Sequence, residues 1–350
     1  MKKKLIKINP KCLVITSINK PNKVIKKFTR ICASQNINFV FVSDKKTPIF
    51  KYKNLKILDL KSQSKLPFFY SKHVPFNSYS RKNIGYLYSM YHGANQIFET
   101  DDDNYPMTNF FSQDLKKLNI SYIKNTGFIN IYKYFFRNNL IWPRGLPLSK
   151  IISDNKIKFK KKNKTNINFQ LVQRLCDGNP DVDAIYRLIN KNININFDKN
   201  LGFYCNNKSF VPFNSQNTIW NKKIFPLMYL PTYCTMRATD IWRAYITTHI
   251  MNKLNMKIIF TSPTVYQDRN FHNLYNDFKL EIPVYRDVES LTNELSKVKI
   301  YNLEKYMLIN LFNCYKKLVN NKIFDKKELI LVKLWCKDIS RFFPNLIKIK

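Results

Sequence analysis

The chain has 350 residues, 45% of them hydrophobic and 15% aromatic, which is enough for a sizeable core in one large or two small domains. The 60 lysines and arginines outnumber the 23 acidic residues and give a formal net charge of +37, which suits anionic lipid, nucleic acid or polyphosphorylated substrates but also plain solvated surfaces. The six glycines are far apart and none precedes lysine, which argues against a glycine-rich phosphate loop or a dinucleotide fingerprint.

The N-terminal sequence M-K-K-K-L-I-K is basic, but no apolar segment follows it, so it does not have the pattern of a signal peptide. No run of about 18 apolar residues occurs, and we expect no membrane-spanning helix. The seven cysteines are odd in number and lack C-x-x-C spacing, which predicts reduced thiols. We therefore expect a cytoplasmic protein whose contact with a membrane would be peripheral, on its inner surface.

The first sixty residues alternate between strands and a helix. Apolar, β-branched runs predict the strands, and apolar residues at helical spacing predict the helix. The strands are Cys12–Ser17, Asn38–Ser43 and Lys56–Leu60, and the helix is Val24–Gln35. With the helix and strand that follow, this order predicts an α/β fold with a largely parallel sheet.

Apolar residues between Ser78 and Gly93 recur at i, i+3, i+4 and i+7, which predicts a helix. Ser78 or Ser80 suits its N-cap, and Gly93 suits the position just after its end. Arg81 and Lys82 lie in the first turn, where cations oppose the helix dipole unless an anion is nearby. A nucleotide diphosphate would supply that anion.

Three consecutive acids follow this helix and the strand-like segment Gln96–Thr100, in the sequence Q-I-F-E-T-D-D-D-N. In an extended chain Asp101 and Asp103 would face one way and Asp102 the other. A hard divalent cation such as Mn²⁺ or Mg²⁺ would relieve the repulsion between the paired carboxylates at the end of the strand. A solvated acidic turn that caps a helix is the alternative that these residues leave open.

The middle of the chain is rich in turn residues and in charge. The basic segment Lys150–Lys164 is expected to be an exposed loop or edge hairpin, and its scarcity of aromatic residues does not favour nucleic-acid binding. Asn179 and Pro180 favour a turn, and Asp181 or Asp183 suits the cap of the short helix that follows.

Two later segments carry further candidate site residues. In the loop P-F-N-S-Q-N-T, the side chains of Asn214, Gln216 and Asn217 offer neutral donors and acceptors for sugar hydroxyls, although plain polar loops have the same composition. Asp240 stands at the start of a helix expected to reach about Leu254. Backbone N–H groups and neighbouring arginines can keep it ionised there, and a plain helix cap is the alternative.

The last third begins with a strand, Lys257–Phe260, followed by a segment whose Arg269 could pair with phosphate oxygens. Beyond it the pattern is helical, with Glu304–Val319 and Asp325–Phe342 carrying lysines opposite their apolar faces, a pattern suited to a membrane surface. We expect a catalytic domain over residues 1–285 and a helical extension over 286–350.

The segments Y-S-R-K-N-I-G-Y-L-Y and H-G-A-x-x-I-F-E-T-D-D-D-N resemble the STELLO family of probable glycosyltransferases. More distantly they resemble the reversibly glycosylated polypeptides, which are UDP-arabinopyranose mutases. The segments G-x-P-D-V-D-A-I-x-R, P-F-N-S-Q-N-T and D-I-W-R-x-Y are also similar to STELLO proteins, so the resemblance covers roughly Leu13 to Asn273. It implies a GT-A fold and a nucleotide sugar held through a divalent metal, Mn²⁺ or Mg²⁺.

The resemblance also implies a role for each candidate residue. Asp240 would take up the proton of the acceptor hydroxyl as that hydroxyl attacks the sugar. The other expected sets are Asp101, Asp103 and His272 for the metal; Arg81, Lys82 and Arg269 for the diphosphate; Thr16, Ser17 and Asp44 for the nucleoside; and Asp181, Asp183, Asn214, Gln216, Asn217 and Arg243 for the sugar and acceptor.

The sequence as a whole therefore favours a metal-dependent glycosyltransferase that moves a sugar from a nucleotide sugar, a UDP-sugar being favoured, to a glycan or lipid-linked acceptor. A sugar-nucleotide mutase, a non-catalytic scaffold of polysaccharide synthesis that retains the GT-A fold, and a basic nucleic-acid-binding protein are the alternatives. The intact triple aspartate, with Arg81, Lys82, Asp240 and His272, argues against a scaffold.

Overall fold

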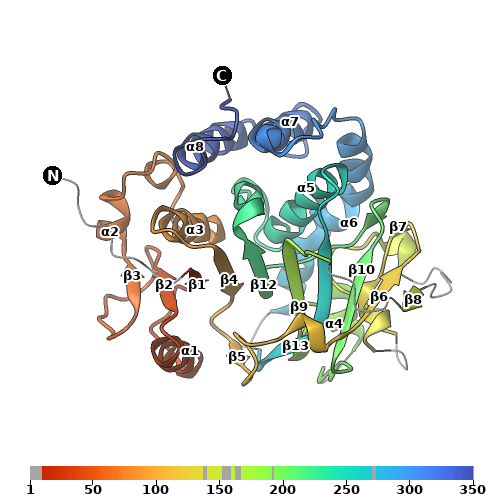
Figure 1. The fold of residues 1–350 in the computed structure, drawn as a ribbon, viewed down its shortest axis with the longest axis horizontal. Helices are drawn as coiled ribbons and strands as arrows, with labels where there is room; N and C mark the ends of the chain where they lie inside the picture. The colour runs from red at the N-terminus through yellow and green to blue at the C-terminus, as the bar shows by residue number, and fades with distance from the viewer. Residues whose placement is uncertain are drawn as a thin grey trace.

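A large mixed sheet runs through the molecule, with helices stacked on one face and helix α1, Lys23–Ser34, on the other (Figure 1). The computed structural model describes residues 10–136, 140–151, 159–161, 167–190, 193–269 and 273–349. The eleven strands of the sheet are β1 Lys11–Thr16, β2 Asn38–Val42, β3 Lys56–Leu58, β4 Gln96–Thr100, β5 Asn104–Pro106, β6 Asn119–Ile123, β8 Phe159–Lys161, β9 Leu171–Gly178, β10 Leu201–Cys205, β12 Asn217–Asn221 and β13 Ile258–Gln267. A separate two-stranded sheet pairs β7 Gly127–Phe128 with β11 Ser209–Phe210.

The helices among the described residues vary from one turn to more than six. The α-helices are α1 Lys23–Ser34, α2 Leu60–Ser64, α3 Lys82–Tyr91, α4 Ala184–Ile189, α5 Thr239–Lys253, α6 Leu274–Ser296, α7 Met307–Asn320 and α8 Lys327–Phe342. Short 3₁₀ helices are η1 Tyr70–Lys72, η2 Tyr79–Arg81, η3 Leu115–Lys117, η4 Ile131–Tyr134, η5 Leu148–Lys150, η6 Lys222–Met228 and η7 Glu304–Tyr306.

The strand order is β3-β2-β1-β4-β12-β9-β13-β10-β6-β8, with β5 paired to β13. The first four strands are parallel, as the sequence predicts. Beyond β4 the sheet is mixed, so the expectation of a largely parallel sheet is confirmed only in part. Strand β12 is antiparallel to both β4 and β9, and β10 is antiparallel to β13, whereas β9 is parallel to β13 and β6 is parallel to β10. Parallel neighbours need long crossovers, usually helical, and few helices interrupt the chain between β4 and α5.

The helices form two layers above one face of the sheet. Helix α3 packs on β1 and β2, while α1 contacts β2 and β5 from the opposite face. Helices α7 and α8 form an outer layer over α3 and α5. Gly85 lets α3 approach the sheet, since a Cβ there would lie 2.6 Å from Val14 Cγ1 and 2.7 Å from Val42 Cγ2. This close packing fixes the helix that leads into β4.

The C-terminal helices share the core of the rest of the chain. The rings of Tyr229 and Tyr315 lie 5.3 Å apart, and the indole N–H of Trp335 donates to the Pro226 carbonyl at 2.9 Å. Helix α6 runs without a break across the domain boundary expected between residues 285 and 286. Among the described helices, none combines the length and the apolar character needed to cross a membrane.

Candidate active site at the carboxyl ends of the strands

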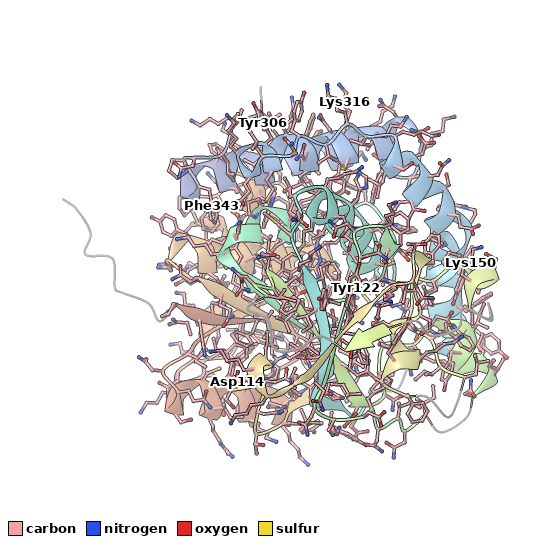
Figure 2. All side chains as sticks on the ribbon, turned by 45° about the vertical axis from the view of Figure 1, so that its right-hand side comes forward. Asp114, Tyr122, Lys150, Tyr306, Lys316 and Phe343 are labelled. Carbon is pink, nitrogen blue, oxygen red and sulfur yellow. The ribbon has the colours of Figure 1, made fainter. Side chains whose placement is uncertain are left out.

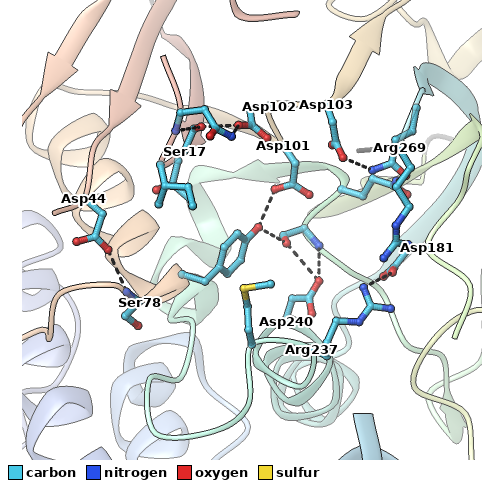
Figure 3. Close-up of a pocket in the computed structure, with 18 of the residues that line it drawn as sticks. Ser17, Asp44, Ser78, Asp101, Asp102, Asp103, Asp181, Arg237, Asp240 and Arg269 are labelled. Atoms are coloured by element: carbon cyan, nitrogen blue, oxygen red, sulfur yellow. Dashed lines mark hydrogen bonds and ion pairs between the residues drawn. The ribbon is translucent and has the colours of Figure 1, made fainter. Parts of the chain in front are cut away.

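A cavity of about 490 Å³ opens where β1, β2 and β4 end and α5 begins (Figure 3). Nine of the site residues that the sequence predicts line this cavity: Thr16, Ser17, Asp44, Asp101, Asp103, Asp181, Gln216, Asp240 and Arg269. The sheet therefore brings together segments that are more than 200 residues apart in the chain. It does so at the edge where parallel strands commonly bind ligands.

The triple aspartate forms the turn that follows β4. Figure 3 shows Asp101 and Asp103 pointing into the cavity and Asp102 turned toward Ser17, whose hydroxyl donates to it. Asp101 Oδ1 accepts from Tyr79 at 2.8 Å and from Lys82 Nζ at 3.1 Å. Asp103 Oδ2 accepts from the Gln267 amide at 2.8 Å.

These contacts leave one oxygen of Asp103 without a partner. Its Oδ1 atom is buried and accepts no hydrogen bond from any described residue. Burial raises the pKa of Asp103 to about 6, and repulsion from Asp101 and Asp102 adds to the shift. Burial also raises the pKa of Asp101. Two such carboxylates fit a hard cation that takes one or two protein oxygens and fills its shell with phosphate and water.

The protein ligands for such a cation are few. Within the part of the chain that the structure describes, no three His, Cys, Asp or Glu residues are grouped to hold a metal ion. The third expected ligand, His272, lies outside the described residues. A cation at Asp101 and Asp103 would therefore depend on oxygens from the substrate, which matches the behaviour of Mg²⁺ with phosphates.

The residues expected to meet the nucleoside lie at one end of the cavity. The Thr16 hydroxyl donates to the Val42 carbonyl at 3.0 Å, which ties the ends of β1 and β2 together. Asp44 Oδ2 accepts from the Ser78 backbone N–H at 3.0 Å and thereby fixes the entry to η2. These side chains shape the end of the cavity as well as facing it.

Asp240 lies in the first turn of α5, and its side chain does not cap the helix. Arg144 donates two hydrogen bonds to this carboxylate, one to Oδ1 at 2.9 Å and one to Oδ2 at 3.0 Å. Ser215 donates to Oδ2 from its backbone N–H at 3.1 Å and from its hydroxyl at 3.2 Å. Burial alone would raise the pKa of Asp240, but the Arg144 guanidinium outweighs it and lowers the pKa to about 2.

A chain of hydrogen bonds connects the two acidic groups across the cavity. The Tyr79 hydroxyl donates to Asp101 and lies 2.6 Å from the Ser215 hydroxyl, which in turn reaches Asp240. Burial and the nearby Asp101 raise the pKa of Tyr79 well above its usual value, so its hydroxyl keeps its proton. Tyr79 thus sets the separation between the aspartate turn and α5.

Arginines that sequence reasoning missed line the other end of the cavity. Arg144 bridges Asp240 and Asp181, with its Nε 3.0 Å from Asp181 Oδ1. It lies in the turn-rich segment W-P-R-G. An arginine between proline and glycine was the only local feature that could have indicated a site residue there. Arg187, on α4, also lines the cavity.

Several expected site residues lie behind the cavity wall instead. Arg81 donates to the Val74 and Pro75 carbonyls at 3.1 and 3.3 Å, and it is turned away from the aspartate turn. Lys82 is fully buried, but its Nζ reaches Asp101 and so acts on the cavity indirectly.

The expected sugar-binding set is also divided by burial. Asp183 caps α4 by accepting from the Tyr186 N–H at 2.6 Å, the alternative that the sequence left open. Arg243 forms a buried ion pair with Glu99 at 2.6 Å. Asn214 and Asn217 are buried and bond other parts of the sheet, so neither side chain lines the cavity.

Comparison with known proteins agrees with the motifs. Residues 237–350, which include Asp240 and α6 to α8, match the family described as STELLO glycosyltransferases. The chain is 27% identical over 278 residues to the probable glycosyltransferase STELLO2 of Arabidopsis thaliana, across 73% of this chain and 35% of that protein.

This chain is thus similar to STELLO proteins in both comparisons. The probable glycosyltransferase STELLO1 of the same plant is 25% identical over 276 residues, with the same shares of each chain. The chain thus spans about a third of the length of these STELLO proteins.

Proposed function

We propose that this STELLO-like chain is a metal-dependent glycosyltransferase with a GT-A arrangement, which transfers a sugar from a nucleotide sugar to a glycan or lipid-linked acceptor. A UDP-sugar is the favoured donor. The observation that carries the proposal is that Asp101 and Asp103 share one cavity with Asp240, connected through Tyr79 and Ser215. The names of the two plant relatives support sugar transfer as the reaction class.

The donor is proposed to lie along the cavity from the ends of β1 and β2 toward the aspartate turn. Thr16, Ser17 and Asp44 would contact the nucleoside, and Asp101 and Asp103 would hold a divalent cation. Such a cation supplies electrostatic stabilisation to the departing diphosphate. Lys82 holds Asp101 in place, and its ammonium group opposes the rise that burial causes in the pKa of that carboxyl.

Asp240 is proposed to position the acceptor hydroxyl. Because Arg144 lowers its pKa to about 2, it remains ionised but is a weak proton acceptor at neutral pH. A carboxylate has about four acceptor sites, and Oδ1 has only Arg144 as a partner among the described residues. A hydroxyl donating to Oδ1 would be held in a fixed orientation toward the sugar.

The metal site can be tested with one substitution at the unpartnered carboxylate. Asp103→Asn should abolish the Mn²⁺-dependent part of UDP-sugar binding, because the amide lacks the negative charge with which the carboxylate attracts the cation. Isothermal titration with and without Mn²⁺ measures this. Asp114→Asn is the matched control, since Asp114 caps η3 outside the cavity and asparagine caps equally well.

Protonation of Asp103 provides a second readout of the same site. Its pKa of about 6 means that Mn²⁺ must compete with a proton below that pH, so affinity should fall about tenfold per pH unit there and stay level above it. If the parent binds a UDP-sugar equally well with and without Mn²⁺, the metal-dependent proposal is wrong.

A further inference from the structure

Three arginines gather at the end of the cavity farthest from the nucleoside residues. Arg187 comes from α4, Arg237 lies two residues before the start of α5, and Arg269 follows β13. In Figure 3 Arg237 and Arg269 lie on one side of Asp101 and Asp240, while Ser17 and Asp44 lie on the other. We call Arg187, Arg237 and Arg269 the arginine triad.

Two members of the triad have a carboxylate partner. Arg237 Nε donates to Glu281 Oε1 at 2.6 Å, and the other Glu281 oxygen accepts from the Ala184 N–H and the Tyr285 hydroxyl. Arg269 donates to Asp277 at 2.7 Å. These pairs hold two guanidinium groups at the cavity wall.

Arg187 differs because its hydrogen bonds go only to neutral groups. It donates to the Asn179 side-chain oxygen at 3.0 Å and to the Pro180 carbonyl at 2.7 Å. Among the described residues no carboxylate lies within ion-pair distance of it, although it is only 5% exposed. A buried cation without a counter-charge is costly, and in most proteins such a cation is paired.

The triad also contains donors that are not satisfied. The Nε atoms of Arg187 and Arg269 are buried and have no hydrogen-bond partner among the described residues. Burial lowers the pKa of Arg187 to about 9, and repulsion from Arg269 and Arg237 adds to that shift. Three guanidinium groups that repel one another, with free donors, form a site that an oxyanion would complete.

We propose that the arginine triad binds a phosphate or carboxylate of the substrate other than the diphosphate of the donor. This inference rests on the proposed function, because it assigns the diphosphate to the aspartate turn. The acceptor's phosphate and a carboxylate on the transferred sugar share this chemistry. Arg144 joins the triad's end of the cavity to Asp240, so the anion would sit beside the positioned acceptor hydroxyl.

Inorganic phosphate is a direct probe of the triad in the full chain. At constant ionic strength, calorimetry should show phosphate binding whose affinity changes less than about threefold when UDP and Mn²⁺ are saturating. Arg187→Gln should weaken phosphate binding at least tenfold, the loss expected for a charge-assisted hydrogen bond, and should leave UDP–Mn²⁺ affinity unchanged. Arg286→Gln is the matched control, because Arg286 is exposed and pairs with Asp287 outside the cavity.

Competition between phosphate and UDP in the parent would overturn the inference, since the triad would then be the diphosphate site. Unchanged phosphate affinity in Arg187→Gln would overturn it as well. If that variant does not fold, the competition experiment on the parent decides. Arg187→Lys, which keeps the charge, then replaces Arg187→Gln as the variant. A parent that binds phosphate through Arg187 but binds no UDP would contradict the proposed function and not the triad.

The same assay distinguishes the two sources of the anion. If the transferred sugar carries it, UDP-glucuronate should bind more tightly than UDP-glucose and should displace phosphate. If the acceptor carries it, both UDP-sugars should bind with equal affinity, and phosphate should bind in the presence of either.

Discussion

Asp103 and Asp240 are carboxylates in one cavity whose neighbours shift their pKa values in opposite directions. Burial raises the pKa of Asp103 to about 6. The two neighbouring carboxylates add to this shift, and the only hydrogen-bond donor to Asp103 among the described residues is the Gln267 amide. Asp240 is buried too, but two guanidinium nitrogens and two donors of Ser215 hold it ionised, with a pKa of about 2. The first environment suits a cation, and the second suits a fixed hydrogen-bond acceptor.

Asp240→Asn separates positioning from donor binding. We expect normal folding, near-parental affinity for the nucleotide sugar, and transfer that is slower by about 100-fold, the loss typical of a misplaced reacting group. Asparagine can still accept from Ser215, and Arg144 keeps Asp181 as its partner. Steady-state transfer rates and a donor titration measure the two effects.

Asp287→Asn is the matched control, since Asp287 also pairs with an arginine but on the outside of α6. Unchanged transfer in Asp240→Asn would mean that Asp240 has only a structural role, in which it connects Arg144 with Ser215. No transfer by the parent, across a broad panel of donors and acceptors, would favour the scaffold alternative.

The sequence predicted the acidic residues of the cavity better than its basic ones. Asp101, Asp103 and Asp240 stand at the ends of well-defined elements, so their positions follow from local pattern. Arg144 contacts Asp240 across 96 residues, and nothing local signals such a pair. Arg243 follows Asp240 by one turn, but it pairs with the buried Glu99 and does not line the cavity.

At the scale of elements, local patterns predicted the beginning of the chain and the C-terminal helices α7 and α8 more closely than strand β13. Strands β1, β2 and β4 and helices α1 and α3 start within one residue or a few of their expected positions, because each has a simple apolar period. Strand β13 continues seven residues beyond the expected Phe260, through Thr261, Ser262 and Pro263. Those residues favour turns locally, and pairing with β9 and β5 overrides that preference.

Helix α3 offers a test of how closely helix and sheet pack. Alanine normally stabilises a helix relative to glycine by about 1 kcal/mol. At Gly85 the new methyl group would meet Val14 and Val42, so we expect Gly85→Ala to lower the free energy of unfolding by roughly 1–3 kcal/mol. Urea denaturation measures the change.

The double variants Gly85→Ala with Val14→Ala and Gly85→Ala with Val42→Ala test the cause. Each removes one of the two contacting side chains, so the penalty for the added methyl should shrink relative to the matching valine single variant. A gain in stability from Gly85→Ala alone would show that α3 can move away from β1 and β2 without cost.

At the scale of the whole molecule, the C-terminal helices α7 and α8 bury their acidic side chains and expose lysines and an arginine. The two acids of α8 are buried: Glu328 accepts from the Thr232 and Tyr233 N–H groups, and Asp338 from those of Phe69 and Tyr70. The exposed side of α7, α8 and the turn between them carries one acid, Asp325, and the basic residues Lys316, Lys322, Lys326, Lys327, Lys333, Lys337 and Arg341. Figure 2 shows Lys316 projecting outward from this layer, which we call the outer basic face.

The outer basic face is predicted to bind anionic membrane surfaces. Each lysine near such a surface contributes about 1 kcal/mol, an attraction that is screened within a Debye length of roughly 10 Å at 0.1 M salt. Vesicles containing phosphatidylserine should therefore retain the protein at low salt and release it near molar salt, as measured by co-sedimentation. Phosphatidylcholine vesicles should retain little.

A pair of matched variants shows whether position or total charge is responsible. Changing Lys316, Lys326 and Lys333 to glutamate should weaken binding to anionic vesicles at least tenfold, because the substitutions lie on the outer basic face. The same change at Lys23, Lys26 and Lys27, which are exposed on α1 beneath the sheet, alters the net charge equally and should weaken binding less than threefold. Equal losses in the two variants, or equal binding of the parent to neutral vesicles, would mean that the outer basic face has no special role.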